Sequence, residues 1–188
     1  IGIIKAHQER YKNLSVLQLD AHADLRDHYN GSPYNHACAL HQASKDTNLV
    51  QVGIRSMDPS ELPFLRKSHC YFAEDIFGQI DWMEESIKQL TEDVYLTIDL
   101  DVFDPSIMPS TGTPEPGGLL WNTTIEYLRK LFNSIYVVGF FILLFAPIYV
   151  LFSPAFLAAK FFYLFLRSIF LSSFSIIHFL SPLSLIHL

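Results

Sequence analysis

Short apolar runs alternate with amphipathic or polar segments along the first 134 residues of the chain. The apolar runs are rich in Val, Ile and Leu, as in strands of a parallel sheet, and the segments between them have helical spacing. The expected strands span 14–19, 49–54, 70–73, 94–100 and 135–140, and the expected helices span 3–12, 36–45, 61–67, 81–90 and 123–132. Ser60 and Asn122 are the expected N-caps of two of these helices. Strands that alternate with helices predict an α/β fold with a parallel sheet covered on both faces.

Beyond residue 134 the pattern changes to an almost uniformly apolar tail. Residues 1–134 contain all 19 acidic residues and 11 of the 13 Lys and Arg residues, which gives them a formal charge of −8. Residues 135–188 contain only Lys160 and Arg167 as charged residues, together with 11 of the 16 Phe residues. The chain therefore combines an acidic body with an apolar tail.

The charge and the cysteine content narrow the class of protein. The acidic body has no stripe of Lys and Arg that could neutralise phosphates, so nucleic acid is not an expected partner. Cys38 and Cys70 are too few for a disulfide framework and fit packed residues in a reducing compartment. The sequence opens on folded-looking segments rather than on a secretory signal, and we expect a cytoplasmic protein.

Two groups of acidic residues lie at the carboxyl ends of two expected strands. Asp20, His22 and Asp24 follow the first strand, and Asp99 and Asp101 close the fourth. Residues two apart in extended backbone point to the same side, and ligands of open parallel sheets bind at the carboxyl ends of the strands. We therefore expect four carboxylates and one imidazole to share one pocket.

Such a pocket predicts a divalent metal site. Neighbouring carboxylates raise one another's pKa and do not stay ionised together without a cation. Oxygen ligands with one imidazole favour a hard or borderline ion such as Mn²⁺, and two such ions supply hydroxide for hydrolysis near neutral pH. Either group alone is equally compatible with turn-forming aspartates, whereas two groups at matching strand ends favour the metal.

Four motifs resemble the ureohydrolases, the arginase and agmatinase family, with agmatinase as the nearest variant. They are DAHADLRD over 20–27, NHACAL over 35–40, GIRS over 53–56 and TIDLDVFDPSIMPSTGTPEPGGL over 97–119. The resemblance implies a three-layer α/β/α fold around a parallel sheet and a pair of Mn²⁺ ions. It also implies hydrolysis of a guanidino substrate to urea and an amine, with agmatine to putrescine as the expected case, and a homo-oligomer, either a trimer or a hexamer.

The resemblance also implies roles for single residues. Asp20, His22, Asp24, Asp99 and Asp101 match five of the family's six metal ligands. His36 matches the loop histidine that serves as proton shuttle beside the substrate, a step that suits an imidazole because it exchanges protons near neutral pH. In the loop over 104–118, we interpret Asp104 as a turn former and Glu115 as solvated.

The chain departs from the family pattern at both ends. The sixth ligand, a histidine in a GGxHS-type motif, is expected just upstream of Ile1, so the sequence suggests a ureohydrolase domain over 1–147 that is incomplete at its N-terminus. The family pattern VGFDIVELAP corresponds to 138–147, where Phe141 and Leu144 replace acidic residues. The carboxylate matching Leu144 grips the substrate guanidinium in the family, and its loss predicts impaired catalysis.

Three interpretations remain for the apolar tail. Its part beyond the expected domain is the segment 148–188. The uncharged stretches 135–159 and 168–188 each exceed 20 residues, so a membrane hairpin is one of them. The others are a degenerate or misread family C-terminus, which we favour, and a buried core with an oligomer contact. Two rival functions also remain. One is a catalytically impaired or membrane-attached remnant that keeps part of the metal site, and the other is a binuclear hydrolase acting on amide or phosphate bonds.

Overall fold

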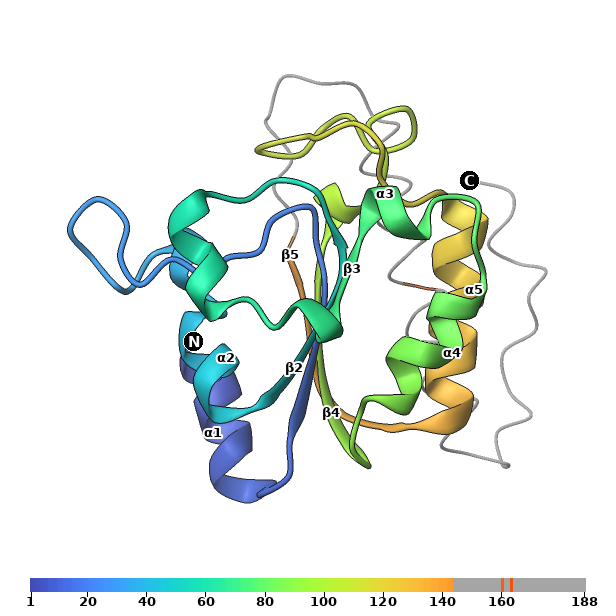
Figure 1. The fold of residues 1–188 in the computed structure, drawn as a ribbon. Helices are drawn as coiled ribbons and strands as arrows, with labels where there is room; N and C mark the ends of the chain where they lie inside the picture. Colours follow the sequence, from blue (N-terminus) through green and yellow to red (C-terminus); the bar gives the residue numbers. More distant parts are fainter. Residues whose placement is uncertain (144–159, 161–162, 164–188) are drawn as a thin grey trace.

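A computed structural model describes residues 1–143, 160 and 163, and five parallel strands form its centre (Figure 1). The strand order is β3-β2-β1-β4-β5, so β1 lies in the middle. The strands are β1 (Ser15–Leu19), β2 (Asn48–Ile54), β3 (Cys70–Phe72), β4 (Asp93–Asp99) and β5 (Tyr136–Leu143). All five side chains of β1 are buried, as expected for a central strand of a sheet covered on both faces.

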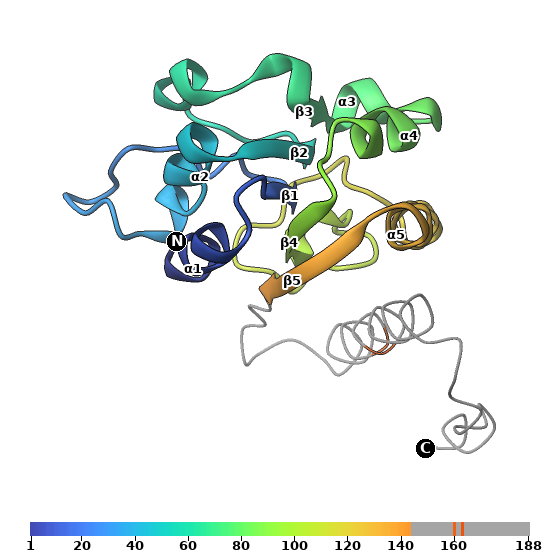
Figure 2. The same cartoon turned by 90° about the horizontal axis from the view of Figure 1, so that it is seen from below.

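Helices cover both faces of this sheet, which makes the fold a three-layer α/β/α arrangement. The helices are α1 (Gly2–Arg10), α2 (His41–Asp46), α3 (Ala73–Ile76), α4 (Asp81–Lys88) and α5 (Trp121–Ser134). Figures 1 and 2 show α1 and α2 on one face, and α4 and α5 side by side on the other. The α/β class expected from the sequence pattern is therefore confirmed.

Alternation along the strands produces two separate cores. Val16 packs with Ile4 of α1 and Ala43 of α2, whereas Leu17 and Leu19 join the core formed with α4 and α5. The second core is the larger one, and its helix residues include Trp82, Met83, Tyr127, Leu128 and Leu131. Burial of such side chains contributes about 1.5–3 kcal/mol each, so this face supplies much of the stability.

Three of the expected helices differ in detail from the observed ones. The helix expected over 36–45 is divided into a 3-10 turn, His36–Cys38, and the separate α2. In place of a helix over 61–67 the chain forms a 3-10 helix, Pro59–Phe64, and its N-cap is Asp58 rather than Ser60. Asp58 and Glu61 form a capping box, which was not expected from the sequence. Asn122 is not a cap either, since α5 begins at Trp121 and its N-cap, Leu120, makes no side-chain hydrogen bond.

Most of the apolar tail lies outside the described residues. Its start forms β5, which extends three residues beyond the expected strand end at 140. Among the described residues, none of the helices is long and apolar enough to cross a membrane. The proposed boundary at 147, Leu144 and the segment 148–188 apart from residues 160 and 163 lie outside the described residues, and those interpretations stay predictions.

Candidate metal centre

The two acidic groups meet because the strands that carry them are neighbours. β1 and β4 pair in parallel with Leu19 opposite Ile98, so Asp20 and Asp99 follow at the same edge of the sheet. A turn of 3-10 helix, Leu100–Val102, then places Asp101 beside the chain that leaves β1. The sheet register thus brings both sequence motifs to one place, as expected.

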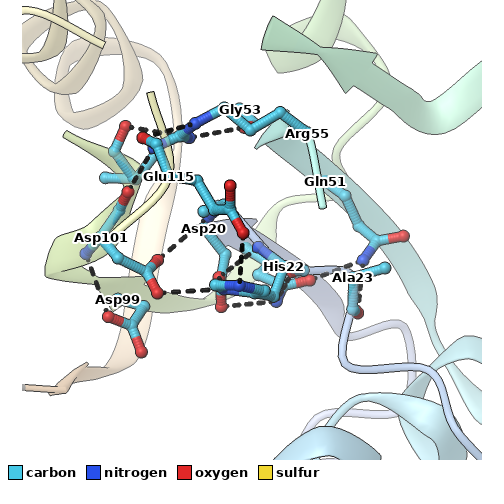
Figure 3. A network of polar contacts seen from close by, with 12 residues as sticks. Asp20, His22, Ala23, Gln51, Gly53, Arg55, Asp99, Asp101 and Glu115 are labelled. Atoms are coloured by element: carbon cyan, nitrogen blue, oxygen red, sulfur yellow. Dashed lines mark hydrogen bonds and ion pairs between the residues drawn. The ribbon is translucent and has the colours of Figure 1, made fainter. Parts of the chain in front are cut away.

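Asp20, His22 and Asp101 form the tightest group of candidate ligands. One ligand atom from each residue lies within 4.8 Å of the other two, and the group could hold a metal ion. His22 Nδ1 is 3.0 Å from Asp101 Oδ2 and 3.6 Å from Asp20 Oδ1 (Figure 3). Asp20 and Asp101 are buried, whereas the His22 side chain is 25% exposed and borders solvent.

Backbone N–H groups fix the orientation of these carboxylates. The His22 N–H donates to Asp20 Oδ1 at 2.7 Å, and the Ala21 N–H donates to Asp101 Oδ1 at 3.1 Å. The Asp101 N–H in turn donates to Asp99 Oδ1 at 3.1 Å. Charge-assisted bonds of this kind hold a carboxylate in place more firmly than neutral ones.

Two glutamines inside the sheet support the first acidic group, and neither was expected from the sequence. Gln51 of β2 donates to Gln18 Oε1 at 2.6 Å and to the Ala23 carbonyl at 2.9 Å. Gln18 of β1 donates to Asp20 Oδ2 at 2.9 Å and to the His22 carbonyl at 3.0 Å. Both side chains are buried, and buried polar groups need hydrogen-bond partners. A glutamine within an apolar strand was therefore the sequence feature that could have indicated these supporting residues.

A cavity of about 230 Å³ adjoins the acidic residues. His36 lines it together with Asp20, Asp24 and Asp99, so the expected proton shuttle faces the same space as three expected ligands. The rings of Tyr29 and His36 pack edge to face, with centroids 5.9 Å apart. The rest of the lining is mostly apolar and comes from α1, β4, β5 and the segment before α2: Ile1, Ile3, Ile4, Ala39, Leu40, Tyr95, Thr97, Phe141 and Leu143.

Burial and mutual repulsion shift the pKa of these groups upward. Burial raises the pKa of Asp24 to about 9 and that of Asp99 to about 8, and the charge of Asp20 adds to both shifts. Burial also raises the pKa of Asp20 to about 6, an effect that its hydrogen bond with His22 partly offsets. The hydrogen bond to Asp101, followed by that to Asp20, raises the pKa of His22 to about 10. Without a metal, Asp24 and Asp99 therefore retain protons near neutral pH, and both must lose them to bind a metal.

This donor set fits a divalent metal pair. Asp20, His22 and Asp101 provide oxygen and imidazole atoms for one ion, and Asp24 and Asp99 add carboxylates that line the same cavity as Asp20. The raised carboxyl pKa values express the cost of burying acidic groups and placing them close together, and a bound cation would offset that cost.

We expect the stability of the metal-free protein to fall as pH rises. Asp20, His22, Asp24 and Asp99 all bind protons more tightly in the folded chain than in the unfolded one, so their contribution to the free energy of unfolding is largest at low pH. That contribution is lost as the pH rises through their folded pKa values, which lie between about 6 and about 10. Mn²⁺ competes with these protons, so its stabilising effect should grow with pH.

Melting temperatures measured with EDTA or with Mn²⁺ at about pH 6 and about pH 8.5 check this expectation. The EDTA-treated protein should melt lower at the higher pH, and the gain from Mn²⁺ should be larger there. A gain that is equal at both pH values would contradict it.

The remaining predicted residues differ in outcome. Asp104 is confirmed as a turn former, because its carboxylate accepts hydrogen bonds from the N–H groups of Ser106, Gly117 and Gly118. Glu115 is more than a solvated residue, since its Oε1 lies 4.0 Å from His22 Nε2. Cys38 and Cys70 are free and buried, as expected.

The fold and this cluster define an α/β/α protein whose acidic site lies at the carboxyl ends of adjacent central strands. The chain belongs to the arginase family, because the family model matches residues 1–166. This finding confirms the resemblance drawn from the motifs.

Individual relatives support the same assignment. The chain is 39% identical over 140 residues to an N(1)-aminopropylagmatine ureohydrolase of Thermus thermophilus, a match that covers 73% of the chain and 48% of the relative. It is 38% identical over 141 residues to the agmatinase of Pyrococcus horikoshii, covering 71% of the chain and 50% of the relative. The chain thus spans about half the length of these relatives.

Solved structures share the architecture. The agmatine ureohydrolase of Thermoplasma volcanium superposes with a TM-score of 0.75 at 33% identity, over 84% of this chain and 55% of that one. The arginase of Bacillus caldovelox gives a TM-score of 0.77 at 25% identity, over 90% and 64% of the two chains. The three-layer α/β/α fold with a parallel sheet is therefore shared with arginases and agmatinases.

Proposed function

We propose that this chain carries the metal-binding part of a ureohydrolase that converts a guanidino compound to urea and an amine. The observation that carries the proposal is the convergence of Asp20, His22, Asp24, Asp99 and Asp101 around one edge of the sheet, beside a cavity that His36 also lines. The proposed cofactor is a pair of Mn²⁺ ions, and the proposed substrates are agmatine and N(1)-aminopropylagmatine, which the names of the relatives suggest.

The reaction needs a nucleophile that attacks a poor electrophile. When bound, the metal pair lowers the pKa of water so that hydroxide forms near neutral pH. Asp20, His22 and Asp101 would hold one ion, and Asp24 and Asp99 would complete the site for the other. The N–H groups that fix Asp20 and Asp101 keep these ligands oriented before any ion binds.

His36 is the proposed proton donor to the leaving amine. Attack of a water oxygen on the guanidinium carbon gives a tetrahedral species, and cleavage of one C–N bond then releases urea. The departing nitrogen needs a proton, which His36 can deliver from its position on the cavity wall. The amine leaves protonated, so atoms and charge balance with one water consumed.

The cavity lining suits a cation carried on a methylene chain. Asp20, Asp24 and Asp99 offer carboxylates at one side, and apolar side chains such as Ile4 and Phe141 face the same space. Carboxylates attract a guanidinium group, and apolar walls accept the methylenes of agmatine or of its aminopropyl derivative.

Urea release from agmatine, N(1)-aminopropylagmatine, arginine and guanidinobutyrate tests the proposal. The assay compares the 188-residue chain with a form joined to the upstream segment of the Thermus relative, each with Mn²⁺ and each with or without Leu144→Glu. We expect the extended form with Leu144→Glu to be the most active, with agmatine or its aminopropyl derivative preferred over arginine. Asp99→Asn in the same form is the matched inactive control.

The outcomes separate the enzyme from its main rival. If no form releases urea although Mn²⁺ is bound, the hydrolase is excluded, and the result supports a remnant that keeps only the metal site. Fewer than about one ion per chain would exclude the metal site itself.

A further inference from the structure

The two ring nitrogens of His22 face carboxylates on opposite sides (Figure 3). Nδ1 points to Asp101 and Asp20, whereas Nε2 lies 4.0 Å from Oε1 of Glu115. Glu115 does not belong to the candidate ligand group, and its side chain is 38% exposed. A carboxylate thus stands on the side of the imidazole that faces away from the candidate metal position.

Arg55 fixes the backbone that carries Glu115. Its guanidinium Nη2 donates to the Asp101 carbonyl at 2.6 Å and to the Glu115 carbonyl at 2.9 Å. Its Nε donates to the Pro116 carbonyl at 3.1 Å. One planar donor from the end of β2 therefore ties the loop around Glu115 to the backbone of the ligand Asp101 (Figure 3).

Close packing holds the same loop from a second side. A Cβ on Gly118 would lie 2.7 Å from Arg55 Nη2 and 2.5 Å from the Asp104 nitrogen, so only glycine fits there. The Asp104 carboxylate also accepts the N–H groups of Gly117 and Gly118. Glu115 is thus presented to His22 by a built loop whose backbone is fixed on two sides.

Metal binding through Nδ1 of His22 requires that Nε2 carry the proton of the imidazole. A neutral imidazole that gives its Nδ1 lone pair to a metal carries its proton on Nε2, and such a donor in a metal site commonly bonds to a carboxylate. Closing the 4.0 Å gap to hydrogen-bond distance needs a shift of about 1 Å in a partly exposed side chain. We propose that Glu115 is a positioning residue that accepts the Nε2–H of His22 and thereby fixes the tautomer and ring orientation for metal binding. This inference rests on the metal site of the proposed function.

Mn²⁺ affinity of the full chain, measured by calorimetric titration, tests this role. We expect Glu115→Ala to weaken Mn²⁺ binding by about 10–100-fold, the usual loss for a residue that orients a ligand. Glu115→Gln keeps an acceptor oxygen, so its affinity should stay within about threefold of the parent chain. Glu126→Ala, on the exposed surface of α5, is the matched control and should leave the affinity unchanged.

The absorption spectrum of bound Co²⁺ gives a reading that does not depend on the stability of the Ala variant. Its d–d bands should shift in Glu115→Gln, since a neutral acceptor makes the His22 ligand less basic, and should not shift in Glu126→Ala. Parent-like affinity in Glu115→Ala, equal losses in the Ala and Gln variants, or unshifted bands would each overturn the role of Glu115. A parent chain that binds no metal would instead overturn the proposed function.

Discussion

Asp24→Asn should remove high-affinity Mn²⁺ binding and at the same time stabilise the metal-free protein. Asn cannot supply the anionic oxygen that Mn²⁺ prefers, so we expect the affinity to fall by more than about 100-fold, beyond the loss from an orienting residue. In the metal-free chain, burial and the charge of Asp20 oppose ionisation of Asp24, whose pKa is about 9. An amide avoids this cost, so the melting temperature should rise, more strongly at pH values above neutral.

The backbone at position 24 makes this substitution a clean one. Asp24 has φ 55°, in the left-handed region that Asn also tolerates, so the variant should keep the native turn. For a domain of this size each kcal/mol gained corresponds to about 2–4 °C in melting temperature. Asp46→Asn, at the end of α2 and away from the cavity lining, is the matched control and should leave the Mn²⁺ affinity unchanged. Retained Mn²⁺ affinity in Asp24→Asn would remove Asp24 from the ligand set.

Replacing His36 should separate catalysis from metal binding. We expect His36→Asn to lower kcat for urea release by about 10²–10⁴-fold, the range for a positioned proton donor. The Mn²⁺ affinity should stay at the parent value, because His36 lines the cavity but lies outside the group Asp20, His22 and Asp101. The measurement is urea release at saturating substrate by the extended form, with a Mn²⁺ titration of the same protein.

His28→Asn is the control for this substitution. His28 lies on the same loop, and its ring pairs with the exposed Asp27 rather than facing the cavity. It should retain the parent kcat. Equal losses in the two variants would point to a general effect on the loop, and a parent-like kcat in His36→Asn would remove His36 from the mechanism.

The sequence predicted the sheet better than the helices. Buried parallel strands are continuous apolar runs, and the expected β1, β2 and β4 agree with the observed ones to within one residue at each end. Helix starts depend on which of several short polar residues captures a backbone N–H. Asp58 competes successfully with Ser60 because Glu61 completes a capping box with it.

The candidate site, too, was predictable only in part. The ligands at the ends of β1 and β4 could be paired in advance, because parallel strands bring their carboxyl ends together. The supporting residues could not, since Gln18 and Gln51 meet only through the strand register, and Glu115 reaches His22 only because Arg55 positions a distant loop. Contacts that depend on tertiary packing leave little trace in local sequence.

The amide chain from Gln51 through Gln18 has a consequence for how the site moves. It anchors the turn after β1 to the interior of the sheet, so the backbone there opens only when the central strands separate. Hydrogen exchange at the Ala21 and His22 amides should therefore be among the slowest in the chain, even without metal. The turn that carries Asp20 and His22 is therefore in place before an ion binds, so metal binding there requires the release of protons rather than local folding.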